Sequence, residues 1–215
     1  MTLSDLTEKI INHCRKNNLK KIYICGNGGA GKSTLSKSLS EFAKQYGNVN
    51  LISTDDFLVD TELRKNSKTK WQENNVEFCD RYTSSNKESY FFKNIYEILY
   101  NLENGNDCYY FPKRYKEKNI RKLYADNALT IIEGVGTAFL EINYEKSFCI
   151  LLECNKEEET KRRSTRTIEK NRDNIELYNA NRSSQYRVNV LPLTKNFNLI
   201  VESNSHFEYI IKKEI

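Results

Sequence analysis

The chain has 215 residues, and its 34 lysine and arginine residues against 29 aspartate and glutamate residues give a formal net charge of +5. A chain of this length can bury a sufficient core in a single domain over residues 1–215 without disulfides. The mild positive charge suits a protein that binds anionic phosphates. It falls short of the dense basic surface of a nucleic-acid-binding protein, so we expect no nucleic-acid partner.

The N-terminal segment and the cysteines indicate a cellular compartment. The segment MTLSDLTEKIINHCRKN carries charges throughout and has no continuous apolar run, which predicts neither a signal peptide nor a membrane span. The six cysteines form no C-x-x-C pair, and several lie in apolar runs where cysteine acts as a small hydrophobic residue. We therefore expect a cytoplasmic protein.

The first predicted elements are a helix, a strand and a glycine-rich loop. Apolar residues recur at helical spacing from Leu3 to Ile11, which predicts a helix packed on a sheet. The apolar run at 22–25 predicts a strand, and it leads into the sequence GNGGAGKS at 26–33. A further amphipathic helix follows and ends near Gly47. A strand, such a loop and a helix in succession are typical of a P-loop.

The P-loop predicts a site for a nucleoside triphosphate. Its glycines allow consecutive backbone N–H groups to point at phosphate oxygens, and the following helix adds its positive N-terminal end. In this arrangement Lys32 reaches the outer phosphates and the Ser33 hydroxyl ligates Mg²⁺. The predicted nucleotide-binding residues of the loop are Gly26, Asn27, Gly28, Gly29, Ala30, Gly31, Lys32, Ser33 and Thr34.

A second predicted strand, Val49–Ser53, runs into the polar turn TDDFL at 54–58. Ligands bind at the carboxyl ends of parallel strands in open α/β sheets, which makes this turn a candidate part of the site. Successive side chains of an extended backbone point to opposite faces, so we expect the carboxylates of Asp55 and Asp56 to diverge.

The next segments give weaker signals. The polar stretch Asp60–Thr83 has no clean period and is interpreted as a loop over the site, in which Trp71 either stacks on a substrate or pins the loop to the body. A helix is predicted from Ser89 to Asn104, and a strand from Cys108 to Pro112. The basic stretch 113–118 is either a solvated face or an anion site.

The remaining predicted strands complete a five-stranded parallel sheet. They lie at 128–132, 148–152 and 198–201, and helices are predicted at 156–170, 174–186 and 207–211. Glu133 follows the first of these strands, where a Walker B carboxylate would hold Mg²⁺ directly or through water. A carboxylate with a purely structural partner is the alternative.

An arginine-rich segment lies between the last two strands. Arg162, Arg163 and Arg166 lie on adjacent faces of a predicted helix, so their guanidinium groups could converge on one polyphosphate as part of a lid. The alternative is a surface helix whose arginines pair with neighbouring glutamates.

Four segments in this order resemble the uridine kinase, phosphoribulokinase and bacterial pantothenate kinase group of P-loop small-molecule kinases: GNGGAGKS, STDDFL, IIEGV and RRSTR-x-x-EKNRD. The resemblance implies an α/β P-loop NTPase fold, with a five-stranded parallel sheet flanked by helices on both faces. It also implies an arginine-bearing lid at about 156–173 and an acceptor-site insertion at about 58–120. The implied substrates are ATP, with Mg²⁺, and a small hydroxyl-bearing metabolite that receives the γ-phosphoryl group.

The resemblance also assigns roles to individual residues. Asp55 falls on the position of the base for the acceptor hydroxyl, in a T-D-x-F context most like pantothenate kinase. Glu133 matches the acidic residue of the E-G element that holds Mg²⁺. The implied lid residues are Arg162 and Arg166 as catalytic groups and Arg163 as a nucleotide-binding group.

The acceptor is left open by the sequence. Uridine kinases carry a Pro-x-Tyr-Asp-like segment, whereas here Phe111-Pro112 is followed by Lys113-Arg114-Tyr115, which keeps the proline and at most the tyrosine. The choice between a uridine-like and a pantothenate-like acceptor therefore stays open. A nucleotide-dependent switch or assembly ATPase without a small acceptor is the alternative function. The preference for ATP over GTP, the choice of Asp55 over Asp56 as base, and the oligomeric state, including a homodimer, also stay open.

Overall fold

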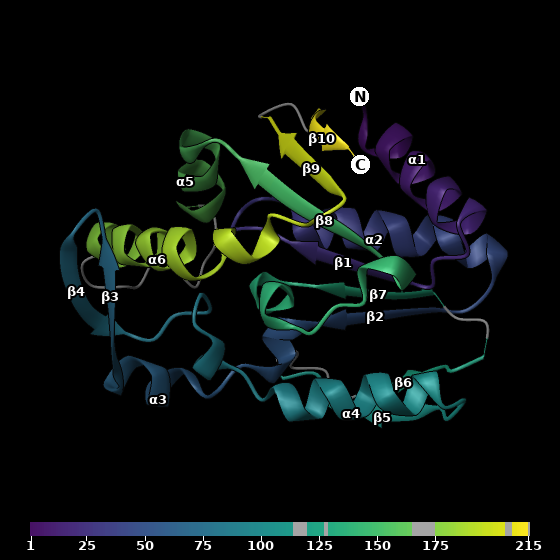
Figure 1. Cartoon of the computed structure of the whole chain (residues 1–215), viewed down its shortest axis with the longest axis horizontal. Coiled ribbons are helices and arrows are strands. Elements are labelled where there is room, and N and C mark those ends of the chain that lie inside the picture. The colour runs from purple at the N-terminus through teal and green to yellow at the C-terminus, as the bar shows by residue number, and fades with distance from the viewer. Residues whose placement is uncertain (114–119, 127–128, 165–174, 205–207, 215) are drawn as a thin grey trace.

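The computed structural model describes residues 1–113, 120–126, 129–164, 175–204 and 208–214. Its centre is a sheet with strand order β10-β9-β8-β1-β7-β2, flanked by helices on both faces (Figure 1). Five neighbouring strands are parallel, as predicted: β2 (Val49–Ser53), β7 (Leu129–Glu133), β1 (Lys21–Cys25), β8 (Ser147–Cys154) and β9 (Leu199–Ser203).

The sixth strand corrects the predicted C-terminal helix at 207–211. Strand β10 (Tyr209–Glu214) pairs antiparallel with β9 at the edge of the sheet. Tyr209 is buried and Ile210 is exposed, which is the two-residue alternation of a strand with one covered face. A window of five residues is too short for periodicity to separate this pattern from a helical one.

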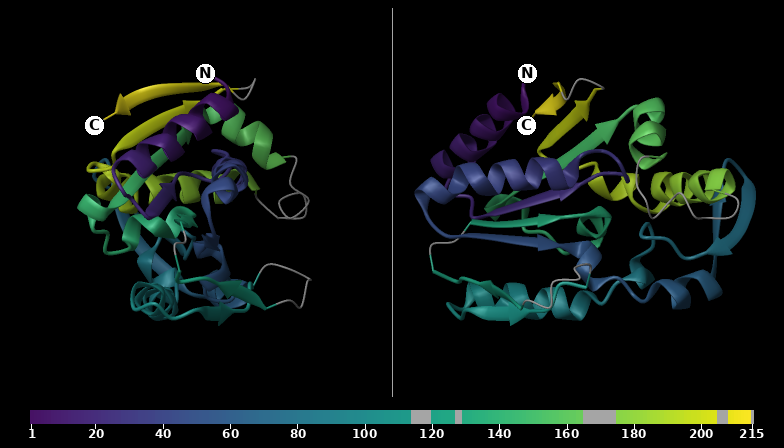
Figure 2. Two further views of the ribbon diagram at one scale, coloured as in Figure 1. Left: turned by 90° about the vertical axis from the view of Figure 1, so that its right-hand side faces the viewer. Right: turned by 180° about the vertical axis from the view of Figure 1, so that it is seen from behind.

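Alternating side chains of the sheet pack into two separate hydrophobic cores, one on each face. Ile22 and Ile24 of β1 pack in a core with α1 (Leu3–Lys16) and α2 (Lys32–Ala43), which cross one face of the sheet (Figure 2). Tyr23 and Cys25 of the same strand belong to the core on the opposite face, with α4 (Phe92–Glu103) and part of α6 (Ile175–Asn189). Because both faces are covered, the strands read as continuous apolar runs in the sequence.

The segment predicted as a loop at 60–83 is folded, which corrects that prediction. It contains α3 (Thr61–Asn66) and an antiparallel hairpin of β3 (Lys68–Glu73) and β4 (Val76–Arg81). The two turn residues, Asn74 and Asn75, have φ values of 51° and 63°, as a type I′ turn requires. The hairpin lies beside α6 at one end of the molecule (Figure 1).

The other elements are short or border the gaps in the description. A small antiparallel pair, β5 (Cys108–Tyr110) and β6 (Arg121–Leu123), lies next to α4, and α5 (Lys156–Ser164) follows β8. Of the basic stretch at 113–118, only Lys113 lies within the described residues. The 3₁₀-helices are η1 (Lys44–Tyr46), η2 (Thr54–Phe57), η3 (Lys87–Ser89), η4 (Val135–Phe139), η5 (Tyr144–Lys146) and η6 (Leu191–Thr194).

Across the described ranges, the chain has no helix that combines the length and the apolar character needed to cross a bilayer.

The sheet topology brings the predicted site segments to one edge. Parallel strands end at the same edge of a sheet, and four predicted segments therefore meet there. They are the P-loop after β1, η2 after β2, Glu133 at the end of β7, and α5 after β8. In Figure 1 this edge faces α5, α6 and the β3–β4 hairpin.

Candidate active site

The glycine-rich loop connects β1 directly to α2, as the sequence predicted. Gly29 and Gly31 have φ values of +90° and +96°, which residues with a side chain rarely adopt. Gly31 is the N-cap residue, and its carbonyl accepts the first helical hydrogen bonds from Thr34 and Leu35 at 3.0 Å each. Lys32 and Ser33 therefore begin α2, and the N-terminal end of this helix opens onto the loop.

Lys32 is half-buried and lies close to several charged groups. Its ammonium donates a hydrogen bond to the backbone carbonyl of Asn27 at 3.0 Å, across the loop. Burial lowers the pKa of Lys32, and the negative charges of Glu133 and Asp55 oppose this shift. These interactions place both carboxylates within electrostatic reach of the P-loop lysine.

Glu133 joins the P-loop to the end of β2. Its Oε1 accepts hydrogen bonds from Ser33 at 3.3 Å and from Ser53 at 3.0 Å. Ser53 was not singled out in the sequence, although it is the register partner of Glu133 in the β2–β7 pair. Burial raises the pKa of the Glu133 carboxyl, and Lys32 opposes that shift.

The residues around Glu133 fit a bound Mg²⁺. The Ser33 hydroxyl and the Glu133 carboxylate are the oxygen ligands that Mg²⁺ prefers. Among the described residues no group of three or more His, Cys, Asp or Glu could hold a metal ion. A Mg²⁺ ion here would therefore take its other ligands from phosphates and water, which is its usual habit in phosphoryl-transfer sites.

Asp55 and Asp56 diverge, although not for the predicted reason. Both lie in the 3₁₀-helix η2 and not in an extended backbone, so the strand alternation does not apply. Asp56 is only 6% exposed, and its Oδ2 accepts a hydrogen bond from the Tyr110 hydroxyl at 3.2 Å. Asp55 is half-buried and lines a cavity on the side of α3. Asp55 lines this cavity, and its negative charge opposes the lowering of the Lys32 pKa.

The two arginines of the predicted lid that the structure describes are built into the protein. Arg162 donates to the Gly29 carbonyl at 3.1 Å and to the Ser203 hydroxyl at 3.0 Å. Arg163 is 2% exposed and donates to the Gly28 carbonyl at 3.1 Å. Both side chains contact the P-loop from the covered face of α5, whose other face, with Lys161, is exposed, and their assignment to a lid stays a prediction.

The rest of the predicted lid, residues 165–173 with Arg166, lies outside the described residues. The assignment of Arg166 as a catalytic residue therefore stays a prediction.

Arg182 is a site residue that the sequence did not reveal. A Cβ atom placed on Gly28 would lie 2.7 Å from Nη2 of Arg182. The charge of Arg182 also lowers the pKa of Lys32. Arg182 lies within α6, and no local motif marks it, because its approach to the P-loop depends on how α6 packs.

Trp71 pins the hairpin to α6. Its indole Nε1 donates to the Ser184 hydroxyl at 2.7 Å, and its ring stacks on Phe78 with centroids 5.4 Å apart. The indole is 7% exposed and does not line the cavity beside Asp55. Of the two roles weighed for Trp71, the structure favours the structural one.

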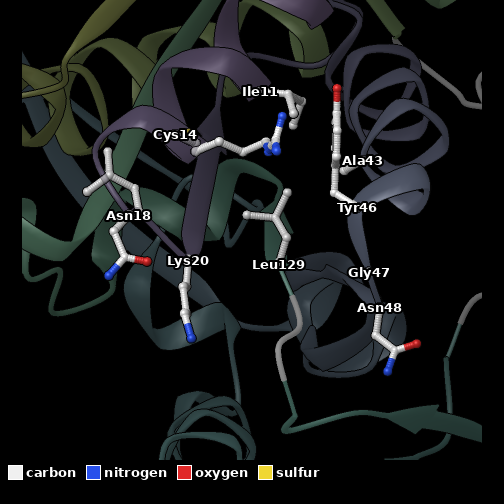
Figure 3. A pocket seen from close by; sticks show the side chains of 11 residues that line it. Ile11, Cys14, Asn18, Lys20, Ala43, Tyr46, Gly47, Asn48 and Leu129 are labelled. Carbon is white, nitrogen blue, oxygen red and sulfur yellow. The ribbon is translucent and has the colours of Figure 1, made fainter.

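Another cavity, of about 230 Å³, lies at the opposite edge of the sheet (Figure 3). Its lining residues come from α1, the loop after α1, the end of α2, the loop before β2 and the start of β7, and they include Ile11, Asn18, Ala43, Asn48 and Leu129. This is the amino-terminal edge of the parallel strands, away from the P-loop. Open α/β sheets bind ligands at the carboxyl edge, so we place the candidate site there.

Comparisons with known proteins agree on one family and one fold. The sequence model of the Phosphoribulokinase / Uridine kinase family matches residues 21–206. A search of curated protein sequences finds no match.

Several solved structures are similar over nearly the whole chain. D-glycerate 3-kinase from Cryptococcus neoformans var. grubii has a TM-score of 0.64 at 8% identity, with 97% of this chain and 98% of that chain covered. The YGR205w protein has a TM-score of 0.62 at 15% identity, with coverages of 100% and 99%. A structure described as a possible uridine kinase from Bacillus stearothermophilus has a TM-score of 0.50 at 16% identity, with coverages of 91% and 98%. At these identities the likeness establishes the fold alone.

Proposed function

The chain belongs to the phosphoribulokinase / uridine kinase family, and on this premise we propose that it is an ATP- and Mg²⁺-dependent kinase. The reaction transfers the γ-phosphoryl group of ATP to a hydroxyl group of a small metabolite. The observation that carries the proposal is the convergence of Lys32, Glu133 and Asp55 at the carboxyl edge of the sheet, where their charges act on one another.

The P-loop and the start of α2 bind the phosphates of ATP in this proposal. The backbone of 26–31 curls around the phosphate oxygens, and the N-terminal end of α2 faces their negative charge. The Lys32 ammonium exchanges its bond to the Asn27 carbonyl for the outer phosphates. Arg163, and Arg182 from α6, add positive charge next to Gly28.

Ser33 and Glu133 hold Mg²⁺, through the hydroxyl oxygen and the carboxylate oxygens. The charge neutralisation that Mg²⁺ supplies when bound falls on the phosphate oxygens, where negative charge develops during transfer. Ser53 fixes the orientation of the Glu133 carboxylate by donating to Oε1. In this proposal Glu133 is a Walker B carboxylate and not a purely structural one.

Asp55 acts on the acceptor. It accepts the proton of the acceptor hydroxyl while that oxygen attacks the γ-phosphorus of ATP. One O–P bond forms, the bond from the γ-phosphorus to the β,γ-bridging oxygen breaks, and ADP leaves with the electron pair. Phosphoryl transfer depends mainly on positioning and on charge stabilisation, so a small set of residues suffices.

Steady-state ADP release tests the proposal. With ATP and Mg²⁺ alone the rate should be low, and addition of a metabolite pool should raise it sharply. An ADP release rate that no small molecule changes would favour the nucleotide-dependent switch or assembly ATPase.

The Lys32→Ala variant is the control for the site assignment. Loss of one such electrostatic group lowers the rate by about 10²-fold or more. Its circular dichroism spectrum should match the wild type, so that loss of rate is not loss of fold. Unchanged turnover in Lys32→Ala would contradict the nucleotide site.

A cytoplasmic location belongs to the same proposal. All six cysteines are free thiols in the structure, and unpaired cysteines are usual in reducing compartments. Fractionation of cells that express the tagged protein would test it.

A further inference from the structure

The cavity beside Asp55 carries an excess of positive charge. Its volume is about 300 Å³, and its charged lining residues are one carboxylate and four basic groups: Asp55, Arg64, Lys65, Arg81 and Lys113. Asp55, together with Glu133, also opposes the lowering of the Lys32 pKa, so the cavity borders the phosphate end of the nucleotide site. This inference rests on the proposed function, because it assigns the cavity to the phosphoryl acceptor.

The basic groups reach the cavity from separate parts of the chain. Arg64 and Lys65 belong to α3, Arg81 ends β4, and Lys113 follows β5. A solvated charged face arises from neighbouring positions of one element, as on the surface of a single helix. Convergence from three elements on one cavity is instead the arrangement of a binding site.

Arg64 is half-buried, and two contacts within its own segment hold it in place. Its Nε donates to the Val59 carbonyl at 3.0 Å, and its Nη2 makes a long contact of 3.5 Å with the Thr61 hydroxyl. Burial lowers the pKa of Arg64, because the half-buried guanidinium has lost part of its contact with water. A guanidinium has five N–H donors, so these two contacts leave others for a ligand.

Two further cations are fixed by contacts that keep their charge. The Arg81 guanidinium lies over the Tyr178 ring, 4.4 Å from its centroid, and the Lys113 ammonium donates to the Leu58 carbonyl. Neither a ring face nor a carbonyl neutralises a positive charge. Lys65 is different, because it forms an ion pair with Glu62 at 2.8 Å and contributes less to the field in the cavity.

We propose that the phosphoryl acceptor is a compact anion, a hydroxy acid or a polyol phosphate. Its hydroxyl faces Asp55, and its carboxylate or phosphate is bound by Arg64, Arg81 and Lys113. Arginine binds either group through two parallel hydrogen bonds, and a dehydrated cation discriminates strongly against a neutral ligand. The cavity volume is at the lower limit of ordinary ligand pockets, which suits a compact acceptor.

Matched acceptor sets test the proposal by coupled ADP release. The sets are glycerol, glycerate and glycerol 3-phosphate, and ribose, ribonate and ribose 5-phosphate. We expect the anionic members to exceed the neutral ones in kcat/KM by about 10-fold or more, as loss of a charge-assisted hydrogen bond implies. The comparison of carboxylate with phosphate members separates the two anion classes. Equal or better turnover of the neutral members would overturn the proposal.

A binding measurement decides the case in which none of these compounds is the natural acceptor. The protein is first saturated with Mg²⁺ and a non-hydrolysable ATP analogue, so that added anions do not occupy the P-loop. Calorimetric titration with glycerol 3-phosphate, glycerate and glycerol should show the anions binding at least about 10-fold more tightly. Equal affinities would overturn the anion site even if the protein proves to be a kinase for a neutral acceptor.

Substitutions locate the binding. Arg64→Gln and, separately, Lys113→Gln should weaken anion binding by about 10-fold and leave the affinity for the ATP analogue unchanged. Lys70→Gln, an exposed lysine of β3 outside the cavity, is the matched control and should bind like the wild type. Anion affinity unchanged in both cavity variants would refute the site. Failure of the proposed function is a separate outcome, because then no metabolite pool raises ADP release in any variant.

Discussion

Removal of the Arg163 side chain should destabilise the protein strongly. Arg163 is 2% exposed and forms an ion pair with Glu159, whose side chain is 13% exposed. It also donates to the Gly28 carbonyl at 3.1 Å and to Asn27 Oδ1 at 3.0 Å. Alanine would leave the Glu159 carboxylate partly buried without its counter-charge, and would leave two acceptors of the P-loop without this donor.

The size of the effect follows from this burial. Breaking a buried ion pair by removing one partner costs about 3–5 kcal/mol. In a domain of this size each 1 kcal/mol lowers Tm by about 2–4 °C, so Arg163→Ala should lower Tm by about 6–20 °C. ATP affinity should fall as well, because the Asn27 and Gly28 positions of the P-loop lose their support.

Thermal and urea unfolding of the ligand-free protein measure this effect. Lys161→Ala is the matched control, because Lys161 lies on the same helix with its side chain 75% exposed, and an exposed charge contributes less than about 1 kcal/mol. A double-mutant cycle with Glu159→Gln isolates the pair. If Arg163→Ala has the same Tm as the Lys161→Ala control but a lower turnover rate, Arg163 belongs to an exposed catalytic lid. That result would refute the reasoning from burial.

Three further outcomes are expected. Asp55→Asn should lower kcat by about 10²- to 10⁴-fold with little change in Tm, whereas Asp56→Asn should lower Tm more than kcat; the reverse pattern would make Asp56 the base. Burial raises the pKa of Glu133, so the folded state binds this proton more tightly and stability falls as the pH rises above 4.5; Glu133→Gln should flatten that part of the pH profile and abolish Mg²⁺-dependent turnover. Trp71→Ala should cost about 3–5 kcal/mol in urea unfolding, since it leaves a cavity between the hairpin and α6; a loss below 1 kcal/mol would mean that Trp71 does not pin the hairpin.

The P-loop and the parallel sheet could be predicted because their signals are local. The glycines, Lys32 and Ser33 lie next to one another in the chain, and the buried strands are continuous apolar runs. Since parallel strands end at one edge, the sequence placed Glu133 and Asp55 at the same edge as the P-loop, whereas the order of the strands came from the structure. Which of the two neighbouring carboxylates faces the cavity depends on η2, whose 3₁₀ geometry has no clear signature in the sequence.

The hairpin and the arginine placements depend on information that is not local. The signal for the hairpin was present in Asn74-Asn75 between two runs of β-forming residues, but its charged residues hid the alternation. Arg182 lies beside Gly28 through the packing of α6, to which the Trp71–Ser184 hydrogen bond contributes. Likewise, Arg162 and Arg163 point into the P-loop because α5 starts at the end of β8, and helical spacing alone could not separate this from a surface helix.

The pKa shifts of Lys32 and Glu133, taken together, support a binding site more strongly than either shift does alone. Burial lowers the pKa of Lys32 and raises the pKa of Glu133, so dehydration disfavours the charged form of both, and each charge only partly offsets the cost of the other. A pair retained for stability alone would be replaced to advantage by apolar side chains of similar volume. Here Lys32 follows the glycine-rich loop 26–31, in which Gly29 and Gly31 have positive φ values and no side chains. Glu133 Oε1 accepts hydrogen bonds from two serines, Ser33 and Ser53. Bound phosphates would add negative charge beside Lys32, and a divalent cation would add positive charge beside Glu133, so both ligands would favour the charged forms that burial disfavours.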